Sequence, residues 1–322
     1  MRKRYRRRVV GYELRERLGQ GGFAEVWRAL QFTRGFSRDV CIKRARGFDG
    51  GVRRALAEEA RLLALISHGN VVRLYDLLED EHGQLELCLE FVDGCDMARL
   101  QRCGSTTVNA ELLVAIGAEL GGALDVLAGI DGGVVHRDVS PHNVMLGRDG
   151  AVKLIDLGIA RAAAREAWTA SGVVKGKPMY LSPEQARGGA LSPASDVFAL
   201  GLVLYELASG INPWGSDTWV HPRRLSWRAP EPLDALRPDL PPALARVIHQ
   251  LLAEQPADRP SGGVAARALL QCLPSAAVLP AAVALPAAVA SAVRRICDGP
   301  AASAHATTDR TLEITAYDYP AS

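Results

Sequence analysis

The stretch that decides the fold is HRDVSPHNVMLGRDGAVKLIDLG, residues 136–158. Its second half is patterned as a hairpin, because the segments NVML and AVKL flank the turn GRDG. Folding at this turn brings Asn143 close to Asp156, so that an amide oxygen and a carboxylate meet. Such oxygen ligands suit Mg²⁺. Asp138 lies just ahead of the hairpin, where we expect it to accept a proton from a hydroxyl group.

A glycine cluster, LGQGGFAEV, lies upstream at residues 18–26 between two expected strands. Gly19 and Gly21 allow a hairpin backbone to lie close over phosphate groups, where larger side chains would clash. Ala24 replaces the third glycine of the G-x-G-x-x-G pattern. Taken alone, the cluster is weak evidence, because a glycine-rich turn is usually only a turn.

Lys43 ends the apolar segment VCIK, and a helix is predicted soon afterwards, over residues 53–66. Glu59 lies three residues after Leu56 and four before Leu63, so it belongs to the apolar face of that helix. A carboxylate on a buried face needs a cation. We therefore expect Lys43 to pair with Glu59.

Composition sets the broad class. The chain has 322 residues, 48% of them hydrophobic and 23% charged, which is enough for a substantial core in one large or two ordinary domains. The net charge of +2 gives no global attraction to nucleic acid. Six cysteines without a CxxC pair favour a reduced, cytoplasmic protein without structural zinc.

The two ends of the chain differ in character. Residues 1–11 start with a basic run that no apolar segment follows, so we expect no secretory signal. This arm is interpreted as solvated, with contact to anionic lipid, a partner or nucleic acid as the alternative. Residues 274–322 begin as an Ala/Pro-rich segment with LPAAVA twice in succession, and we expect a disordered linker and tail. A membrane span there is long enough but disfavoured by its prolines and alanines.

The chain as a whole resembles the protein kinase superfamily, and most closely the eukaryotic-like (Hanks-type) serine/threonine kinases of bacteria. The resemblance runs over residues 12–273, and the family's motifs occur in order. They are the glycine loop, VCIK, Glu59, HRDVSPHN, DLG at 156–158, SPE at 182–184, SDVFALG with Asp196, and ADRPS with Arg259. The implied fold is α+β, with a small β-rich N-lobe over about 12–92 and a larger helical C-lobe over about 93–273. The strand expected at 85–92 and the buried helix at 195–209 agree with this layout.

The resemblance also implies roles for individual positions. Lys43, oriented by Glu59, would hold the ATP phosphates, and Asp138 would be the catalytic base. Asn143 and Asp156 would hold Mg²⁺. The residues implied around ATP are Leu18, Gly19, Gly21, Gly22, Val26, Cys41, Lys43, Leu89, Glu90, Val92 and Met145. Glu184 with Arg259 would form a structural ion pair, and Asp196 would brace the catalytic loop.

One departure from the family pattern bears on activity. Serine/threonine kinases carry a lysine two residues after the catalytic Asp and a threonine shortly before the SPE-type motif. This chain has Ser140 at the first position and Lys177 at the second. We interpret this as an exchange of partners, so that the Lys177 ammonium reaches the space beside Ser140. Independent drift of the two positions, or a pseudokinase, is the alternative.

The predicted activity is transfer of the γ-phosphoryl group of Mg²⁺-ATP to serine or threonine hydroxyls of a protein. Arg137 next to Asp138 suggests control by activation-loop phosphorylation, with Thr169 and Ser171 as acceptors and self-association as the route. The expected partner is a protein substrate, no nucleic acid is expected, and membrane contact is disfavoured. The alternative function is a nucleotide-binding pseudokinase scaffold.

Overall fold

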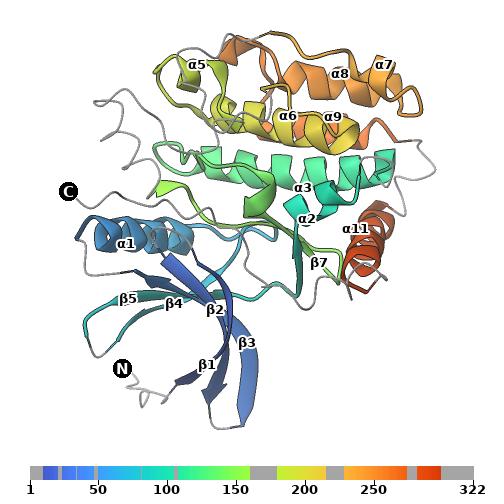
Figure 1. Cartoon of the computed structure of the whole chain (residues 1–322). Helices are drawn as coiled ribbons and strands as arrows, with labels where there is room; N and C mark the ends of the chain where they lie inside the picture. Colours follow the sequence, from blue (N-terminus) through green and yellow to red (C-terminus); the bar gives the residue numbers. More distant parts are fainter. Residues whose placement is uncertain are drawn as a thin grey trace, which may run out of the picture. The chain divides into compact units, whose positions relative to one another are not determined.

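Figure 1 shows a computed structural model of the whole chain, which describes residues 10–20, 24–33, 35–46, 50–80, 82–104, 108–159, 180–214, 228–273 and 281–298. It divides into two compact units. The first comprises the described residues up to Ala64 together with Arg73–Phe91. The second comprises Leu65–Val72 and the described residues from Val92 onward.

The first unit is built on a five-stranded antiparallel sheet in the order β1-β2-β3-β5-β4. One helix, α1, follows β3 in the chain, and its apolar face is buried as the helical spacing predicts. The elements are β1 (Gly11–Gln20), β2 (Ala24–Thr33), β3 (Phe36–Ala45), α1 (Gly50–Leu65), β4 (Leu74–Glu79) and β5 (Leu85–Glu90). The strands and the helix predicted in this part of the chain are confirmed.

The central strands of this sheet have two different faces, because side chains alternate along a strand. One face carries an apolar cluster of Ala29, Val40, Ile42 and Cys88. The opposite face carries Lys43, whose register partner on β2 is Val26. Lys43 and Val26, both predicted to bind ATP, therefore lie on the face opposite the apolar cluster.

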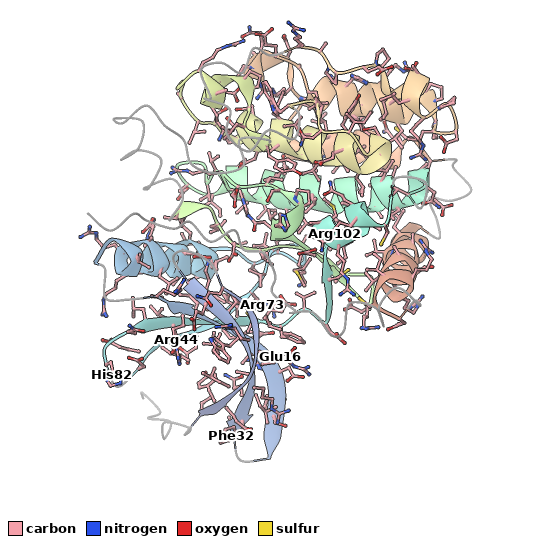
Figure 2. The ribbon with its side chains drawn as sticks, viewed as in Figure 1. Glu16, Phe32, Arg44, Arg73, His82 and Arg102 are labelled. Atoms are coloured by element: carbon pink, nitrogen blue, oxygen red, sulfur yellow. The ribbon has the colours of Figure 1, made fainter. Side chains whose placement is uncertain are left out.

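The tip of the sheet is exposed, and an ion pair between neighbouring strands lies closer to its centre. Figure 2 shows Phe32 at the end of the β2–β3 ribbon, and the Phe32 and Phe36 side chains are both exposed. Arg44, also labelled there, lies opposite Glu86 on β5 and forms an ion pair with it at 2.5 Å. Cross-strand pairs of opposite charge stabilise the β3–β5 register.

The second unit is mainly helical, with α6 and α9 stacked on α3 (Figure 1). Close approach of α3 and α9 requires glycine, because a Cβ at Gly121 would lie 2.8 Å from the carbonyl oxygen of Gly262. The helices are α2 (Met97–Arg102), α3 (Ala110–Gly129), α5 (Pro183–Ala186), α6 (Pro193–Ser209), α7 (Leu233–Leu236), α8 (Pro242–Leu251), α9 (Gly262–Leu270) and α11 (Ala281–Asp298). A small sheet holds β6 (Gly94–Asp96), β7 (Val144–Gly147) and β8 (Val152–Leu154), and two 3₁₀ turns are η2 (Pro141–Asn143) and η5 (Pro256–Asp258). The α+β, kinase-like fold class is confirmed.

The long buried helix predicted at 195–209 is α6, and its sequence defines both ends. Ser192 and Ser195 form a reciprocal capping box at its start, with Pro193 in the first turn. Gly210 ends the helix in the left-handed conformation, at φ 75°. Helix α3 is long and apolar enough to cross a membrane by length and composition alone, but 61% of that window is buried inside the protein.

The boundary between the units differs from the predicted one in the segment after α1. Leu65–Val72 belongs to the second unit rather than to the β-rich part. The Val72 amide donates to the carbonyl oxygen of Leu154 at 2.9 Å, and the Leu154 amide donates to the carbonyl oxygen of Asn70 at 2.7 Å. These bonds add the segment to the edge of β8, a long-range pairing that the local sequence does not show.

The prediction of a disordered linker after residue 273 is wrong for Ala281–Asp298, which forms helix α11. Leu285, Val289, Val293 and Ile296 are buried, and they recur at the spacing of one helical face. Gly150 packs directly against the backbone of Pro286. Tertiary burial therefore outweighs the cost of a proline inside the helix.

Candidate active site

The first unit contributes a buried ion pair. Lys43 lies two residues before the end of β3. Its Nζ is 2.8 Å from both carboxylate oxygens of Glu59 on α1. The two side chains are only 13% and 4% exposed, so water screens the pair little. The pairing predicted from the helical spacing is confirmed, and it fixes the position of an ammonium group on one face of the sheet.

Other predicted ATP-site residues share this face. Val26 is the register partner of Lys43 and also pairs with Gly19 on β1. Cys41 lies two residues before Lys43 and pairs with Leu89 on β5. Leu18 and Glu90 lie near the ends of β1 and β5, whereas Gly21 and Gly22 lie outside the described residues.

The second unit holds the predicted catalytic loop by its backbone. Both carboxylate oxygens of Asp196 accept amide hydrogens, from His136 at 2.6 Å and from Arg137 at 2.9 Å. Arg137 has a left-handed backbone, with φ at 69°, which is unfavourable for a residue with a side chain. Burial raises the pKa of Asp196 to about 7, although the two amide donors oppose that rise. The predicted brace of the loop is confirmed.

Asp138 and Asn143 lie side by side in this loop. The Asn143 Nδ2 group donates to the carbonyl oxygen of Asp138 at 2.8 Å and also to its carboxylate. The amide hydrogen of Ile155 donates to the carbonyl oxygen of Asn143 at 2.9 Å. The hairpin of β7 and β8, with Val144 opposite Leu154, therefore brings Asn143 to the residue before Asp156, as predicted.

Gly158 lets the DLG segment approach Asp138. A Cβ at Gly158 would lie 2.8 Å from the Cβ of Asp138 and 3.0 Å from the carbonyl oxygen of His136. The Gly158 amide donates to that same carbonyl oxygen at 2.9 Å. Asp156 itself has a left-handed backbone, at φ 56°. The structure thus shows why this motif needs its glycine, a role that the sequence interpretation did not assign.

The donor set at this point fits a magnesium ion. Because Nδ2 of Asn143 is directed at Asp138, the amide oxygen of Asn143 is directed away from it. That oxygen and the Asp156 carboxylate are the hard ligands that Mg²⁺ prefers. The described part of the chain contains no cluster of three or more His, Cys, Asp or Glu that could hold a metal. An ion at this position would therefore depend on phosphate oxygens and water for its remaining ligands.

A second buried ion pair joins the SPE segment to Arg259, just after η5. Arg259 donates to both carboxylate oxygens of Glu184 at 2.8 Å, and its guanidinium is fully buried. Burial by itself would raise the pKa of Glu184, but hydrogen bonds from Arg259, Ser182 and Ser195 outweigh it and lower that pKa to about 2. The pair is confirmed, and the Ser195 hydroxyl, 2.8 Å from Glu184, is a partner that the motif alone did not reveal.

The two remaining residues predicted around ATP, Met145 and Val92, belong to the second unit. Met145 on β7 is half-buried and pairs with Asp96 on β6, and Val92 begins the longer part of the second unit. Ser140 is buried. Lys177, Thr169 and Ser171 lie outside the described residues, so the proposed exchange and the phosphorylation sites stay predictions.

Comparison with known proteins agrees with this geometry. Residues 12–272 match the family model described as protein kinase domain. The chain belongs to the protein kinase family. Proteins of this family use ATP, typically with Mg²⁺.

The kinase has curated bacterial relatives over most of its length. It is 35% identical over 263 residues to the tyrosine-protein kinase MasK of Myxococcus xanthus, covering 77% of this chain and 40% of that protein. It is 33% identical to the serine/threonine-protein kinase pkn3 of Myxococcus xanthus, covering 81% and 50%. It is 34% identical to the serine/threonine-protein kinase PknA of Mycobacterium tuberculosis, covering 80% and 60%. The chain thus spans about 40–60% of the length of these relatives.

Solved structures give the same fold. The crystal structure of the PknI kinase domain of Mycobacterium tuberculosis aligns with a TM-score of 0.62 and 28% sequence identity. The alignment covers 81% of this chain and 95% of that one. Helix α11 lies beyond the family match, which ends at residue 272.

Proposed function

We propose that this kinase transfers the γ-phosphoryl group of Mg²⁺-ATP to serine or threonine hydroxyls of a protein substrate. The observation that carries the proposal is the catalytic loop, in which Asp138 is held beside Asn143 on a backbone that Asp196 fixes. Asp138 accepts the proton of the attacking hydroxyl, and Lys43 holds the phosphates. A degenerate kinase more often loses Lys43, Asp138 or Asp156, and this chain keeps all three.

Each unit carries residues with its own proposed role. Lys43 provides the fixed positive charge in the first unit, with Glu59 holding its ammonium. The residues proposed to surround the nucleotide are Leu18, Gly19, Gly21, Gly22, Val26, Cys41, Leu89, Glu90, Val92 and Met145. Asn143 and Asp156 provide the magnesium ligands, and the metal neutralises phosphate charge when bound. Catalysis then rests on positioning and on charge stabilisation.

Serine and threonine are the proposed acceptors for two reasons. Pro141 follows Ser140 as in the serine/threonine form of the catalytic loop. In addition, pkn3 and PknA are named serine/threonine kinases, although MasK is named a tyrosine kinase. Because the relatives are much longer than this chain, neither name transfers directly. Phosphoamino-acid analysis of the product decides between them.

We also propose that Lys177 supplies the ammonium that kinases of this type otherwise carry at the position of Ser140. The structure supports the first half of this idea, since Ser140 is a short, buried residue on the loop that carries Asp138. Lys177→Ala is expected to lower kcat strongly with little change in ATP binding. The double substitution Ser140→Lys with Lys177→Thr is expected to restore much of the activity. An unchanged kcat in Lys177→Ala would remove the exchange.

Control of this kinase is proposed to use Thr169 and Ser171. Arg137, next to Asp138, is the cation that would receive a phosphate from the activation loop. Autophosphorylation at either residue takes place either between two copies of the kinase or within one copy. Phosphopeptide mapping after incubation with ATP and Mg²⁺ tests this, and two unmodified residues would argue for a loop ordered without phosphate.

The cytoplasm is the proposed location, where ATP is available and thiols are reduced.

The experiment for the whole proposal is transfer of label from [γ-³²P]ATP to a generic basic protein, followed by phosphoamino-acid analysis. We expect labelled phosphoserine or phosphothreonine that requires Mg²⁺ and disappears in Lys43→Arg. Labelled phosphotyrosine alone would overturn the acceptor assignment. ATP binding without any transfer would favour the pseudokinase scaffold, for which Ser140 in place of lysine is the one supporting observation.

A further inference from the structure

Helix α11 lies beyond the residues that match the kinase family, and it packs on the second unit. Its buried residues Leu285, Val289, Val293 and Ile296 pack on a surface formed by α2, α3, β6 and β7 (Figure 1). Strand β6 is the first strand after the chain passes from the first unit to the second. The C-terminal turn of α11 therefore lies against the start of the longer part of the second unit, which begins at Val92.

One arginine joins these two segments. Arg148 donates to both carboxylate oxygens of Asp298, the last residue of α11, at 2.8 and 2.9 Å. It also forms an ion pair with Asp93, just before β6, at 3.5 Å, and its amide donates to the Asp93 carbonyl oxygen at 2.8 Å. Asp93 and Asp298 are thus bound to one residue, which brings their neighbours in the chain together.

Those neighbours include two cysteines. Cys95 lies in β6, two residues after Asp93, and Cys297 directly precedes Asp298. Strand β6 and helix α11 are in contact, and the Cys297 thiol lies close enough to Cys95 to affect its titration. Cys95 is only 5% exposed, whereas Cys297 is half-buried. Burial, reinforced by the nearby Cys297, raises the pKa of the Cys95 thiol to about 12.

We propose that Cys95 and Cys297 form a reversible disulfide that locks α11 onto β6 when the protein meets a peroxide. Both thiols are free in the structure, so the bond is a modification that oxidation adds. The contact needs no rearrangement of distant segments, because β6 and the end of α11 already pack together. A disulfide requires close, preset backbone positions, and the Arg148 contacts with Asp93 and Asp298 hold the neighbours of the two cysteines together.

The chemistry balances with one peroxide molecule per bond. Cys297, the more accessible thiol, attacks hydrogen peroxide and becomes a sulfenic acid, with release of one water. The sulfur of Cys95 then attacks the sulfur of that sulfenic acid. The S–S bond forms, the S–O bond breaks, and the leaving hydroxide takes the Cys95 proton to give a second water. Because Cys95 is largely protonated at neutral pH, the second step is slow and the pair responds to sustained oxidant.

The lock has a structural consequence that is independent of phosphoryl transfer. Without it, noncovalent packing and the Arg148 contacts alone hold the segment that follows the kinase domain. With it, that segment cannot leave the second unit even if α11 loosens. The redox state of one cysteine pair would then decide whether α11 is held to the kinase domain by a covalent bond or by noncovalent contacts alone.

The test treats the reduced full chain with hydrogen peroxide, blocks free thiols and maps peptides by mass spectrometry without reduction. We expect a Cys95–Cys297 cross-linked peptide lighter by two hydrogen atoms than its parts, which dithiothreitol separates. The unfolding temperature of the oxidised protein should exceed that of the reduced protein by at least about 5 °C, because the link closes a long loop.

Two single substitutions make the test specific and avoid disturbing the buried Cys95. Cys297→Ser should lose both the cross-link and the thermal shift, whereas Cys103→Ser, which removes an exposed thiol at the end of α2, should keep both. Oxidation of Cys297 without a link to Cys95, a link from Cys297 to Cys103, or a thermal shift that persists in Cys297→Ser would each overturn the proposal. None of these results depends on kinase activity.

Discussion

The predicted functional residues fall into two halves, one in each unit, that are held in different ways. In the first unit, an ion pair between Lys43 and Glu59 holds the ammonium that is proposed to bind phosphate. In the second unit, several backbone contacts fix Asp138, from the Asp196 brace to the close approach of Gly158. Loss of this side-chain pair is therefore expected to weaken the first half directly, whereas the second half keeps its shape unless its backbone moves. The following changes test this difference, from the largest expected effect to the smallest.

Lys43→Arg tests the first half most severely. The guanidinium keeps a positive charge that can still pair with Glu59, but its planar fork cannot occupy the position of the compact ammonium. We expect kcat/KM to fall about 10²–10³-fold, equivalent to about 3–4 kcal/mol. Steady-state kinetics with varied ATP measures this, and circular dichroism checks that the fold is kept. Near wild-type kcat/KM would mean that Lys43 does not hold the phosphates.

The second unit has a buried ion pair of its own, which serves structure. The pKa of Glu184 is about 2 in the folded chain and ordinarily 4.5, so the stability that this group contributes is present above pH 4.5 and is lost as pH falls towards 2. The contribution at neutral pH is about 3 kcal/mol. Glu184→Gln should remove it and flatten the pH dependence of unfolding in this window.

Denaturant unfolding at pH 7 and pH 3 measures the effect of Glu184→Gln. The matched control is Glu58→Gln, which removes an exposed carboxylate paired with Arg61 on α1. Surface pairs contribute little, so the control should leave the unfolding curves unchanged. Equal curves for wild type and Glu184→Gln at both pH values would contradict the assignment of Glu184 and Arg259 as a supporting pair.

Glu59→Gln tests whether one contact really holds the first half. Glutamine keeps the length of the side chain but removes the charge that orients the Lys43 ammonium. Hydrogen bonds to charged groups are worth about 1.5–3 kcal/mol, so we expect kcat to fall about 10–100-fold. ATP titration and single-turnover kinetics separate binding from transfer. Unchanged kcat would show that Lys43 has a second support in the first unit.

Gly158→Ala is the mildest test, directed at the second half. The added methyl group would meet the Cβ of Asp138 at 2.8 Å and shift the base by a few tenths of an ångström. We expect kcat to fall about tenfold with ATP affinity nearly unchanged, because misplacement of a reacting group costs rate before binding. Gly69→Ala is the control, since a Cβ there meets nothing within 4 Å. Equal kcat values for both variants would show that Asp138 tolerates displacement.

The contacts between residues on regular elements were predictable from the sequence. Helical spacing placed Glu59 on the buried face of α1, and the hairpin pattern brought Asn143 to Asp156. The brace by Asp196 and the pair of Glu184 with Arg259 came from the family resemblance, because no local pattern connects segments so far apart in the chain. All of these contacts are present in the structure.

Features that depend on tertiary packing could not be predicted. Helix α11 was missed because its alanines and prolines resemble a linker, although Leu285, Val289, Val293 and Ile296 carried the helical spacing. The segment Leu65–Val72 was assigned to the wrong unit because its partner, β8, lies far along the chain. The proximity of Cys95 and Cys297 could not be predicted either, since it needs α11 to be folded and docked.

The central claim is that Asp138 is the catalytic base of an active kinase, and one measurement addresses it directly. Single-turnover transfer from [γ-³²P]ATP is compared between wild type and Asp138→Asn, after both are shown to bind Mg²⁺-ATP equally. The account predicts rapid label transfer by wild type and a rate at least about 10²-fold lower for Asp138→Asn. Equal rates from the two proteins, whether fast or at background, would contradict it.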